Sequence, residues 1–274
     1  MTVRTPGIKS KTADKAALLK DMLAKMGSAV VAYSGGVDST FLAVTAGDIL
    51  KDRVSIVLAN SPVMSKEDLA AARELAGLLQ LNLQEMHFDP FDVPGFVANG
   101  GDRCYHCKLA MLGILKEMDG KGCVAQICEG SNFDDLGDYR PGRAAISELG
   151  VRSPLAESFL TKKEIRSLAK ARGLPNWDRP AAPCLATRLA QHTRITIDLL
   201  GKIDKGESVI RSLGVKQVRL RHHGDIARIE VDGPGLQILL KQDNRRAAVE
   251  AVSKLGYRYV TVDLAGYRMG SMNL

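Results

Sequence analysis

The chain has 274 residues, of which 45% are hydrophobic and 25% charged, the composition of a globular protein with a substantial core. Its length allows one large domain or two modest ones. The formal net charge of +7 favours an anionic ligand or a nucleic acid, but the basic residues are scattered without a run of five. Charge alone therefore does not establish nucleic-acid binding.

The N-terminal residues and the cysteines indicate the compartment. Residues 1–23 alternate charged and apolar side chains without a long hydrophobic run, so we expect neither a secretory signal nor a membrane span. Five cysteines in such a chain are expected to be thiols or metal ligands in a reducing cytoplasm, not disulfides.

The first part of the chain alternates between predicted helices and strands. Strands are predicted at 29–33, 54–59, 81–87 and 123–128. Helices are predicted at 12–26, directly after Thr40, after an N-cap at Ser65, over 109–118, and after a capping box at Thr161. This alternation indicates a doubly wound α/β fold with a mostly parallel sheet, which binds ligands outside the carboxyl ends of its strands.

The pattern changes after Arg188. A helix is predicted at 197–213, strands at 217–221 and 225–231, a long helix at 235–255 and a closing strand at 257–264. These elements form a small α+β domain. We place the boundary after residue 190, giving domains 1–190 and 191–274.

A glycine-rich loop follows the first predicted strand and precedes a helix. Strand, glycine turn and helix point backbone N–H groups at an anion. The loop has no Walker lysine, and Asp38 can hold Mg²⁺ against phosphates instead. Asn60 and Ser61, at the end of the next strand, are expected at the same sheet edge. The loop residues expected to bind the nucleotide are Ser34, Gly35, Gly36, Asp38, Ser39 and Thr40.

Three cysteines in irregular segments are candidate metal ligands. Cys104 and Cys107 form a C-x-x-C within residues 89–108, which are predicted to form a loop, and Cys184 lies in a second predicted loop. Three thiolates can hold three irons of a [4Fe–4S] cluster and leave one iron open. Zinc with His106 as a fourth ligand and a redox dithiol are the alternatives.

The other two cysteines, Cys123 and Cys128, lie in an apolar run. A strand places them on opposite faces, so we expect buried structural thiols. In the C-terminal part, Arg219 and Arg221 share one face of a predicted strand and can clamp a phosphate. Two such arginines can equally mark a surface that faces solvent or a partner.

Taken together, these segments resemble the LarE family of ATP-dependent sulfur transferases, within the PP-loop ATP pyrophosphatase superfamily. The resemblance spans nearly the whole chain. Besides the glycine loop S-G-G-x-D-S-T, it rests on D-Y-R-P-G at 138–142, C-x-x-x-R at 184–188, V-R-x-R-x-H-x-D-I-A-R-I-E at 218–230 and G-Y-R-x-G-x-M-N at 266–273.

The resemblance implies an adenine nucleotide alpha hydrolase-like fold and sulfur insertion in biosynthesis of the nickel-pincer nucleotide cofactor of lactate racemase. ATP with Mg²⁺ would adenylate the carboxylates of pyridinium-3,5-biscarboxylic acid mononucleotide, and sulfur would displace AMP to give thiocarboxylates. It implies substrate-binding roles for Arg188, Arg219, Arg221 and Glu230.

Within that family there are two ways to supply the sulfur. Some members would give up the sulfur of the cysteine matching Cys184, once per protein. Others have a C-x-x-C as well and would carry sulfide on a [4Fe–4S] cluster, and Cys104, Cys107 and Cys184 place this chain with them. We therefore expect Cys104, Cys107, Cys184 and Asp38 to carry the catalysis.

Rival interpretations stay open. A PP-loop tRNA thiolase also joins ATP to a three-cysteine cluster, and amide-forming PP-loop enzymes and a nucleotide-binding protein with a structural zinc are weaker alternatives. We expect a small-molecule nucleotide substrate, a sulfide or other sulfur donor, no nucleic acid, no membrane, and a homo-oligomer.

Overall fold

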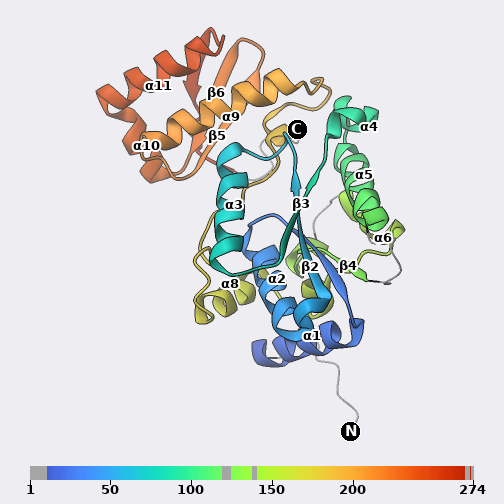
Figure 1. Ribbon diagram of the computed structural model, residues 1–274. Helices are drawn as coiled ribbons and strands as arrows, with labels where there is room; N and C mark the ends of the chain where they lie inside the picture. Colours follow the sequence, from blue (N-terminus) through green and yellow to red (C-terminus); the bar gives the residue numbers. More distant parts are fainter. Residues whose placement is uncertain (1–10, 119–124, 138–140, 269–271, 273–274) are drawn as a thin grey trace. The chain divides into compact units, whose positions relative to one another are not determined.

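The computed structural model describes residues 11–118, 125–137, 141–268 and Met272 (Figure 1). Cys123 and parts of two motifs, 138–140 and 269–271 with 273, lie outside the described residues. The chain folds into two compact units. Unit 1 comprises the residues up to Ser61, Asp68–Pro90 and Asp102–Ala182, and unit 2 comprises Pro62–Glu67, Phe91–Gly101 and the residues from Pro183 onward.

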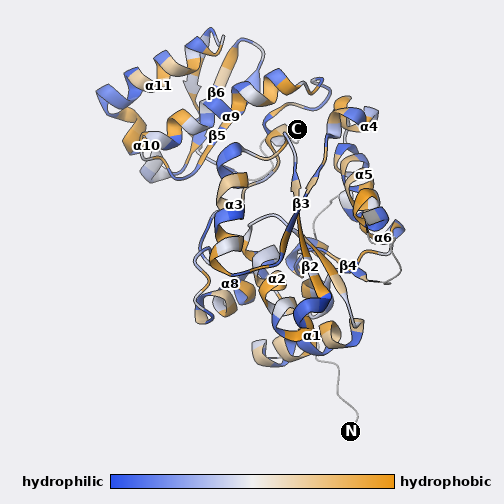
Figure 2. Ribbon diagram, viewed as in Figure 1, coloured by the Kyte–Doolittle hydropathy of each residue, from blue (hydrophilic) through white to orange (hydrophobic). Residues whose placement is uncertain are grey.

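Unit 1 is built on a four-stranded parallel sheet. Ala29 pairs with Val54 on one side and with Gln126 on the other, and every pairing in this sheet is parallel. The central strands are apolar along most of their length, as expected of strands covered on both faces (Figure 2). The predicted doubly wound α/β fold is therefore confirmed. The strand order is β3-β2-β1-β4, with β1 Ala29–Tyr33, β2 Val54–Asn60, β3 Leu83–His87 and β4 Gln126–Cys128.

This strand order creates a topological switch point beside β1. The chain proceeds from β1 outward to β2 and β3, and then returns to the other side of β1 as β4. Ligands bind in doubly wound sheets outside the carboxyl ends of the strands at such a point. The loop at 34–40 follows β1 and the segment 129–132 follows β4, so both begin at the switch point.

Helices cover both faces of the sheet. On one face, Leu112 and Ile146 from two helices join Val30, Val57 and Ile127 from the strands in a buried apolar cluster. On the other face, α2 packs against β1 and contacts both α1 and α8. The helices of unit 1 are α1 Thr12–Met26, α2 Val37–Leu50, α3 Lys66–Leu78 (which starts in unit 2), α5 Arg103–Met118, α6 Gly142–Glu148, α7 Pro154–Glu157 and α8 Lys162–Ala171, with 3₁₀ turns η1 Lys51–Arg53 and η3 Asp134–Leu136.

Unit 2 contains a three-stranded mixed sheet. The hairpin of β5 (Val218–His223) and β6 (Ile226–Val231) turns at Gly224, and β7 (Tyr259–Val262) lies parallel to β6. Helix α9 packs against β5 so closely that a Cβ at Gly206 would lie 2.4 Å from Cδ1 of Leu220. The other elements are α4 Pro94–Val97, η4 Leu185–Arg188, α9 Ile197–Ser212, α10 Gly233–Leu240 and α11 Gln242–Lys254, with η2 Pro90–Asp92 at the join of the units.

The structure differs from the sequence predictions at three places. The predicted long helix at 235–255 is broken at Lys241, whose ψ of 135° is extended backbone. The C-x-x-C does not lie in a loop, because α5 already begins at Arg103. Unit 2 starts at Pro183 and takes in Pro62–Glu67 and Phe91–Gly101.

Backbone and side-chain hydrogen bonds explain the last difference. Leu185 donates from its N–H to the Val63 carbonyl, and Asn99 donates to the carbonyls of Ala190 and Thr193. These bonds attach two distant segments to unit 2. Within the described residues, no helix is long and apolar enough to cross a membrane.

Candidate active site

The glycine loop of unit 1 has the geometry of an anion site. Gly35 has φ of +72°, and its backbone passes so near α3 that a Cβ there would lie 2.7 Å from the Ala72 Cβ. The Ser39 hydroxyl accepts from the Ser34 N–H at 3.2 Å and donates to the Gly36 carbonyl at 3.1 Å. The first turn of α2 follows, and its N–H groups lack intrahelical acceptors. The loop is thus preformed for a phosphate.

Two residues, one at the start of α8 and one beyond its end, hold this loop through hydrogen bonds. Lys162, the first residue of α8, donates to Oδ2 of Asp38 at 2.6 Å. Beyond the other end of α8, the buried Asn176 donates at 3.0 Å to the Gly35 carbonyl and at 3.0 Å to Oγ1 of Thr40. The loop is therefore fixed by side chains more than 120 residues away in the sequence.

The environment of the Asp38 carboxylate is suited to binding Mg²⁺. Its Oδ2 accepts from Lys162 and Asn132, whereas Oδ1 is buried with no hydrogen-bond partner among the described residues. Burial raises the pKa of Asp38, and the Lys162 cation opposes that rise. Mg²⁺ is commonly held by one or two carboxylates together with substrate phosphates. An orphaned carboxylate oxygen beside a phosphate loop suits that arrangement.

A buried carboxylate follows β4 at the switch point. Glu129 accepts from the Ser131 hydroxyl at 2.8 Å, the Ser153 hydroxyl at 2.6 Å and Nζ of Lys108 at 3.2 Å. Burial opposes its ionisation, but Lys108 and the hydroxyls outweigh burial and hold the pKa of Glu129 below its usual range. The next residue, Gly130, passes so near α2 that a Cβ there would lie 3.0 Å from the Ser39 nitrogen.

Asn60 and Ser61 lie at the carboxyl end of β2, as the sequence predicts. Asn60 donates to Glu85 at 3.4 Å, and the buried Ser61 hydroxyl has no hydrogen-bond partner in the described part of the chain. A nucleotide-binding role for these two residues stays a prediction.

The C-x-x-C lies in the first turns of α5 in unit 1. Cys104 is exposed, whereas Cys107 is half-buried and packs against the apolar cluster on one face of the sheet. Nε2 of His106 is hydrogen-bonded to Asp102 at 3.0 Å, and the zinc alternative stays a prediction. Lys108, directly after Cys107, pairs with Glu129 and so links this helix to the segment beside the glycine loop.

Cys128 differs in kind from these cysteines. It is buried on β4, and burial raises the pKa of its thiol to about 12. Such a thiol stays protonated and is a poor metal ligand or nucleophile. The prediction of a structural thiol fits this environment, while Cys123 lies outside the described residues.

Cys184 lies in unit 2, directly before η4. Arg188 fixes the backbone on both sides of it by donating from Nη1 to the carbonyls of Pro183 at 2.6 Å and Cys184 at 3.0 Å. The buried guanidinium is held in turn by Glu207, at 2.8 Å from Nε and 3.0 Å from Nη2. Arg188 is therefore a positioning residue for the Cys184 loop.

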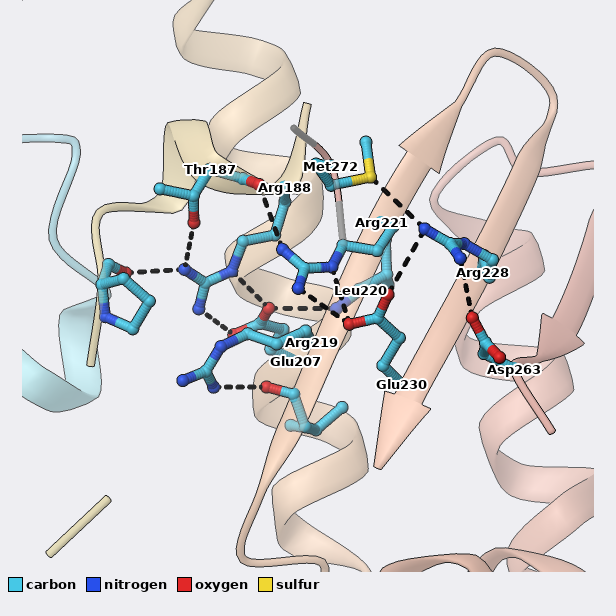
Figure 3. Close-up of polar contacts among 12 residues, drawn as sticks. Thr187, Arg188, Glu207, Arg219, Leu220, Arg221, Arg228, Glu230, Asp263 and Met272 are labelled. Carbon is cyan, nitrogen blue, oxygen red and sulfur yellow. Dashed lines mark hydrogen bonds and ion pairs between the residues drawn. The ribbon is translucent and has the colours of Figure 1, made fainter. Parts of the chain in front are cut away.

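The predicted substrate-binding residues of unit 2 meet in one buried ionic cluster (Figure 3). Arg221 donates from Nε and Nη2 to Glu230 and from Nη1 to the Thr187 carbonyl. Arg228 lies between Glu230, at 3.3 Å, and Asp263, at 2.7 Å.

Arg219 occupies the same face of β5. It donates to the Val218 carbonyl and lies over the Tyr267 ring, 5.2 Å from its centroid. Burial, aided by the Arg188 cation, lowers its pKa. Ion pairs join Arg188 to Glu207, Arg221 to Glu230 and Arg228 to Asp263, and Figure 3 shows these side chains together with Arg219.

The structure brings the predicted residues together in two groups. Unit 1 holds the glycine loop, Asp38 and the C-x-x-C, and unit 2 holds Cys184, Arg188, Arg219, Arg221 and Glu230. In the described part of the chain, no group of three or more His, Cys, Asp or Glu side chains is arranged as metal ligands. A cluster on Cys104, Cys107 and Cys184 thus stays a prediction, as do the roles of the other site residues.

Sequence reasoning missed five polar residues of these groups. Glu207 had a weak signal, because it precedes Arg211 by four residues on α9 and pairs with it at 2.7 Å. The others act across long sequence separations and had none. The five are Lys108, Glu129, Lys162, Asn176 and Glu207.

The phosphate loop at the switch point of a parallel sheet defines an ATP-binding PP-loop protein. Consistent with this, a family model described as NAD synthase matches residues 12–94, which contain β1, the loop, β2 and β3. That match does not reach Cys104, Cys184 or the arginine cluster.

Relatives match both units. The chain is 36% identical to pyridinium-3,5-bisthiocarboxylic acid mononucleotide synthase of Lactiplantibacillus plantarum, over 96% of this chain and 94% of the relative. It is also 36% identical to an uncharacterized protein of Synechocystis, over 93% and 95% of the two chains. A Methanocaldococcus jannaschii protein is 28% identical over 87% and 90%. The chain belongs to the LarE family and is an ATP-using sulfur transferase.

Proposed function

We propose that this protein converts the carboxylates of pyridinium-3,5-biscarboxylic acid mononucleotide into thiocarboxylates during nickel-pincer nucleotide biosynthesis. The observation that carries the proposal is the 36% identity to the Lactiplantibacillus synthase along both units. The alignment spans the phosphate loop and the arginine cluster alike. A relation confined to the ATP-binding half would not favour this substrate over others.

Unit 1 supplies the activation step. The glycine loop and the N-terminus of α2 bind the phosphates of ATP, and Asp38 would hold Mg²⁺ through its carboxylate, whose Oδ1 is buried with no hydrogen-bond partner among the described residues. A substrate carboxylate oxygen attacks the α-phosphorus, and the bond from that phosphorus to the bridging oxygen breaks. Pyrophosphate leaves, and the mixed anhydride with AMP makes the acyl carbon electrophilic.

Unit 2 supplies the groups for the substrate. Arg219 and Arg221 lie on one face of β5, and two guanidiniums on one face suit the phosphate of a mononucleotide. Glu230 lies between Arg221 and Arg228 and orients both guanidiniums.

Cys104, Cys107 and Cys184 would hold a [4Fe–4S] cluster. The burial of the described cysteines supports this choice, because Cys104 is exposed and Cys107 and Cys184 are half-buried, whereas Cys128 is buried with a pKa of about 12. A cluster held by three thiolates would leave one iron without a protein ligand, and an exogenous sulfide bound there would supply the sulfur for the thiocarboxylate.

Product analysis tests the proposed reaction. The full-length protein is incubated without oxygen with the dicarboxylate nucleotide, ATP, Mg²⁺ and sulfide. We expect AMP, pyrophosphate and a product whose mass shows oxygen replaced by sulfur. Pyrophosphate release with no sulfur in the nucleotide would overturn the proposal. Stimulation by bulk tRNA, with a gel shift, would favour the thiolase alternative.

Mössbauer spectroscopy after reconstitution with iron and sulfide tests the cluster. We expect a [4Fe–4S] signal in the wild type, loss of it in Cys104→Ser, and retention in the matched control Cys128→Ser. A protein that takes up no cluster and still transfers sulfur would contradict this part of the proposal and favour Cys184 as a single-use donor.

A further inference from the structure

An aromatic ring from the C-terminal segment lies against one arginine of the buried ionic cluster in unit 2. Cζ of Arg219 is 5.2 Å from the centroid of the Tyr267 ring, within the range of a cation–π contact. Arg219 is only 5% exposed, and such contacts are strongest where the cation is removed from water. The Tyr267 ring is therefore part of the environment that holds this guanidinium.

The backbone around Tyr267 fixes the attachment point of the ring. The Tyr267 N–H donates to the Val231 carbonyl at 3.0 Å, at the end of β6, and the Gly266 N–H donates to the Asp263 carbonyl at 3.0 Å. Gly266 has φ of +70°, and a Cβ there would lie 3.0 Å from the Val231 oxygen. The Asp263 side chain is paired with Arg228 at 2.7 Å. The turn that carries Tyr267 is thus attached both to β6 and to the ionic cluster.

A cation–π contact differs from an ion pair in what it takes from the arginine. Cζ, the centre of the guanidinium, lies over the ring, which attracts the charge through its quadrupole. A carboxylate in a bidentate pair would accept two of the N–H donors and would compete with a phosphate for them. An aromatic ring is therefore a partner that can hold an arginine while the arginine binds a phosphate.

We propose that Tyr267 is a positioning residue that holds the Arg219 guanidinium for the phosphate monoester of the substrate nucleotide. The inference rests on the proposed phosphate-binding role of Arg219 and Arg221. Burial and the Arg188 cation both oppose the charge of Arg219 and lower its pKa. The ring offsets part of this cost without adding a negative charge that would repel the phosphate. The aromatic ring, and not the hydroxyl group, carries the role.

Calorimetry with ribose 5-phosphate on the full-length protein, without ATP, tests this role. The probe presents the phosphate monoester and lacks the pyridinium ring. In Tyr267→Leu we expect the affinity to fall about threefold to thirtyfold, the value of a cation–π contact. Tyr267→Phe keeps the ring and should retain most of the affinity. This variant keeps the test decisive if Tyr267→Leu unfolds, because a folded Tyr267→Phe protein with strongly weakened binding would overturn the inference.

Tyr259 offers a matched control in the same unit, because Arg258 lies over its ring at 5.5 Å while this tyrosine is 52% exposed. Tyr259→Leu should leave the affinity unchanged. In an Arg219→Met background, Tyr267→Leu should have little further effect, since Tyr267 acts through Arg219.

Three results would overturn the inference: wild-type affinity in Tyr267→Leu, equal losses with and without the Arg219 guanidinium, or no binding of ribose 5-phosphate to the wild type. A protein that shows the expected binding pattern and forms no thiocarboxylate would overturn the proposed function alone and leave the role of Tyr267 supported.

Discussion

Substituting Gly35 by alanine tests the close packing of the phosphate loop. Two costs add at this position. A non-glycine residue at φ of +72° costs about 1–2 kcal/mol, because Cβ crowds the backbone in the left-handed region. The new Cβ would also lie 2.7 Å from the Ala72 Cβ and 2.9 Å from its Cα, and overpacking of this kind costs about 1–3 kcal/mol. The expected loss is about 2–5 kcal/mol.

Gly173 offers a matched control. It has φ of +74°, and a Cβ there would meet no atom within 4 Å. Gly173→Ala should therefore lose only the backbone cost, about 1–2 kcal/mol. Urea unfolding followed by the fluorescence of Trp177, the single tryptophan, measures both variants in the unit that contains the loop.

The difference between the two variants isolates the close approach of the loop to α3. The double variant Gly35→Ala with Ala72→Gly should lose less stability than the sum of the losses in the two single variants, because the contact between the two Cβ atoms is absent from it. Equal losses in Gly35→Ala and Gly173→Ala, or strictly additive losses in the double variant, would refute the reasoning that packing against Ala72 sets the loop.

Three other substitutions address the surroundings of the loop and the cysteines. Asn176→Ala removes two buried hydrogen bonds to the loop and should weaken ATP binding on the order of tenfold in calorimetry, whereas unchanged affinity would contradict its positioning role. Hydrogen bonds, including one from Lys15, outweigh burial and hold the pKa of Glu164 at about 2. The ionised Glu164 therefore stabilises the fold fully above about pH 4.5, and this contribution is lost as the pH falls toward 2. Glu164→Gln should reduce the dependence of the unfolding free energy on pH in this acid range. Cys128, with a pKa of about 12, should resist iodoacetamide at pH 8 while Cys104 reacts, and mass mapping that finds Cys128 labelled first would contradict its assignment as an inert thiol.

The fold was predictable because its signals are local. Strand, glycine turn and helix follow one another within residues 29–50, and the alternation of apolar segments recurs along unit 1. The capping box at Thr161 is likewise a four-residue signal, and the structure contains both of its hydrogen bonds.

The partners of the loop were not predictable because they arise from tertiary packing. Asn176 is separated from Gly35 by 141 residues, and Lys162 from Asp38 by 124. Nothing in the local sequence distinguishes Lys162 from the adjacent Lys163. The break at Lys241 carries no glycine or proline either, so a continuous helix was the natural prediction.

The prediction of a loop at the C-x-x-C was wrong for a different reason. Two glycines at 100 and 101 suggested an irregular segment up to residue 108, yet the helix begins at Arg103 immediately after them. Both thiols are therefore presented from the first turns of a helix, where the backbone hydrogen bonds of the helix fix the spacing of the two residues.

The most direct test of the central claim is the number of sulfur atoms transferred per protein. Intact mass spectrometry of the reconstituted protein is combined with quantification of the thiocarboxylate nucleotide during incubation with excess ATP and sulfide. We predict more than one thiocarboxylate per chain, with the mass of the polypeptide, and hence Cys184, unchanged. At most one thiocarboxylate per chain, with loss of one sulfur from the polypeptide at Cys184, would contradict the account.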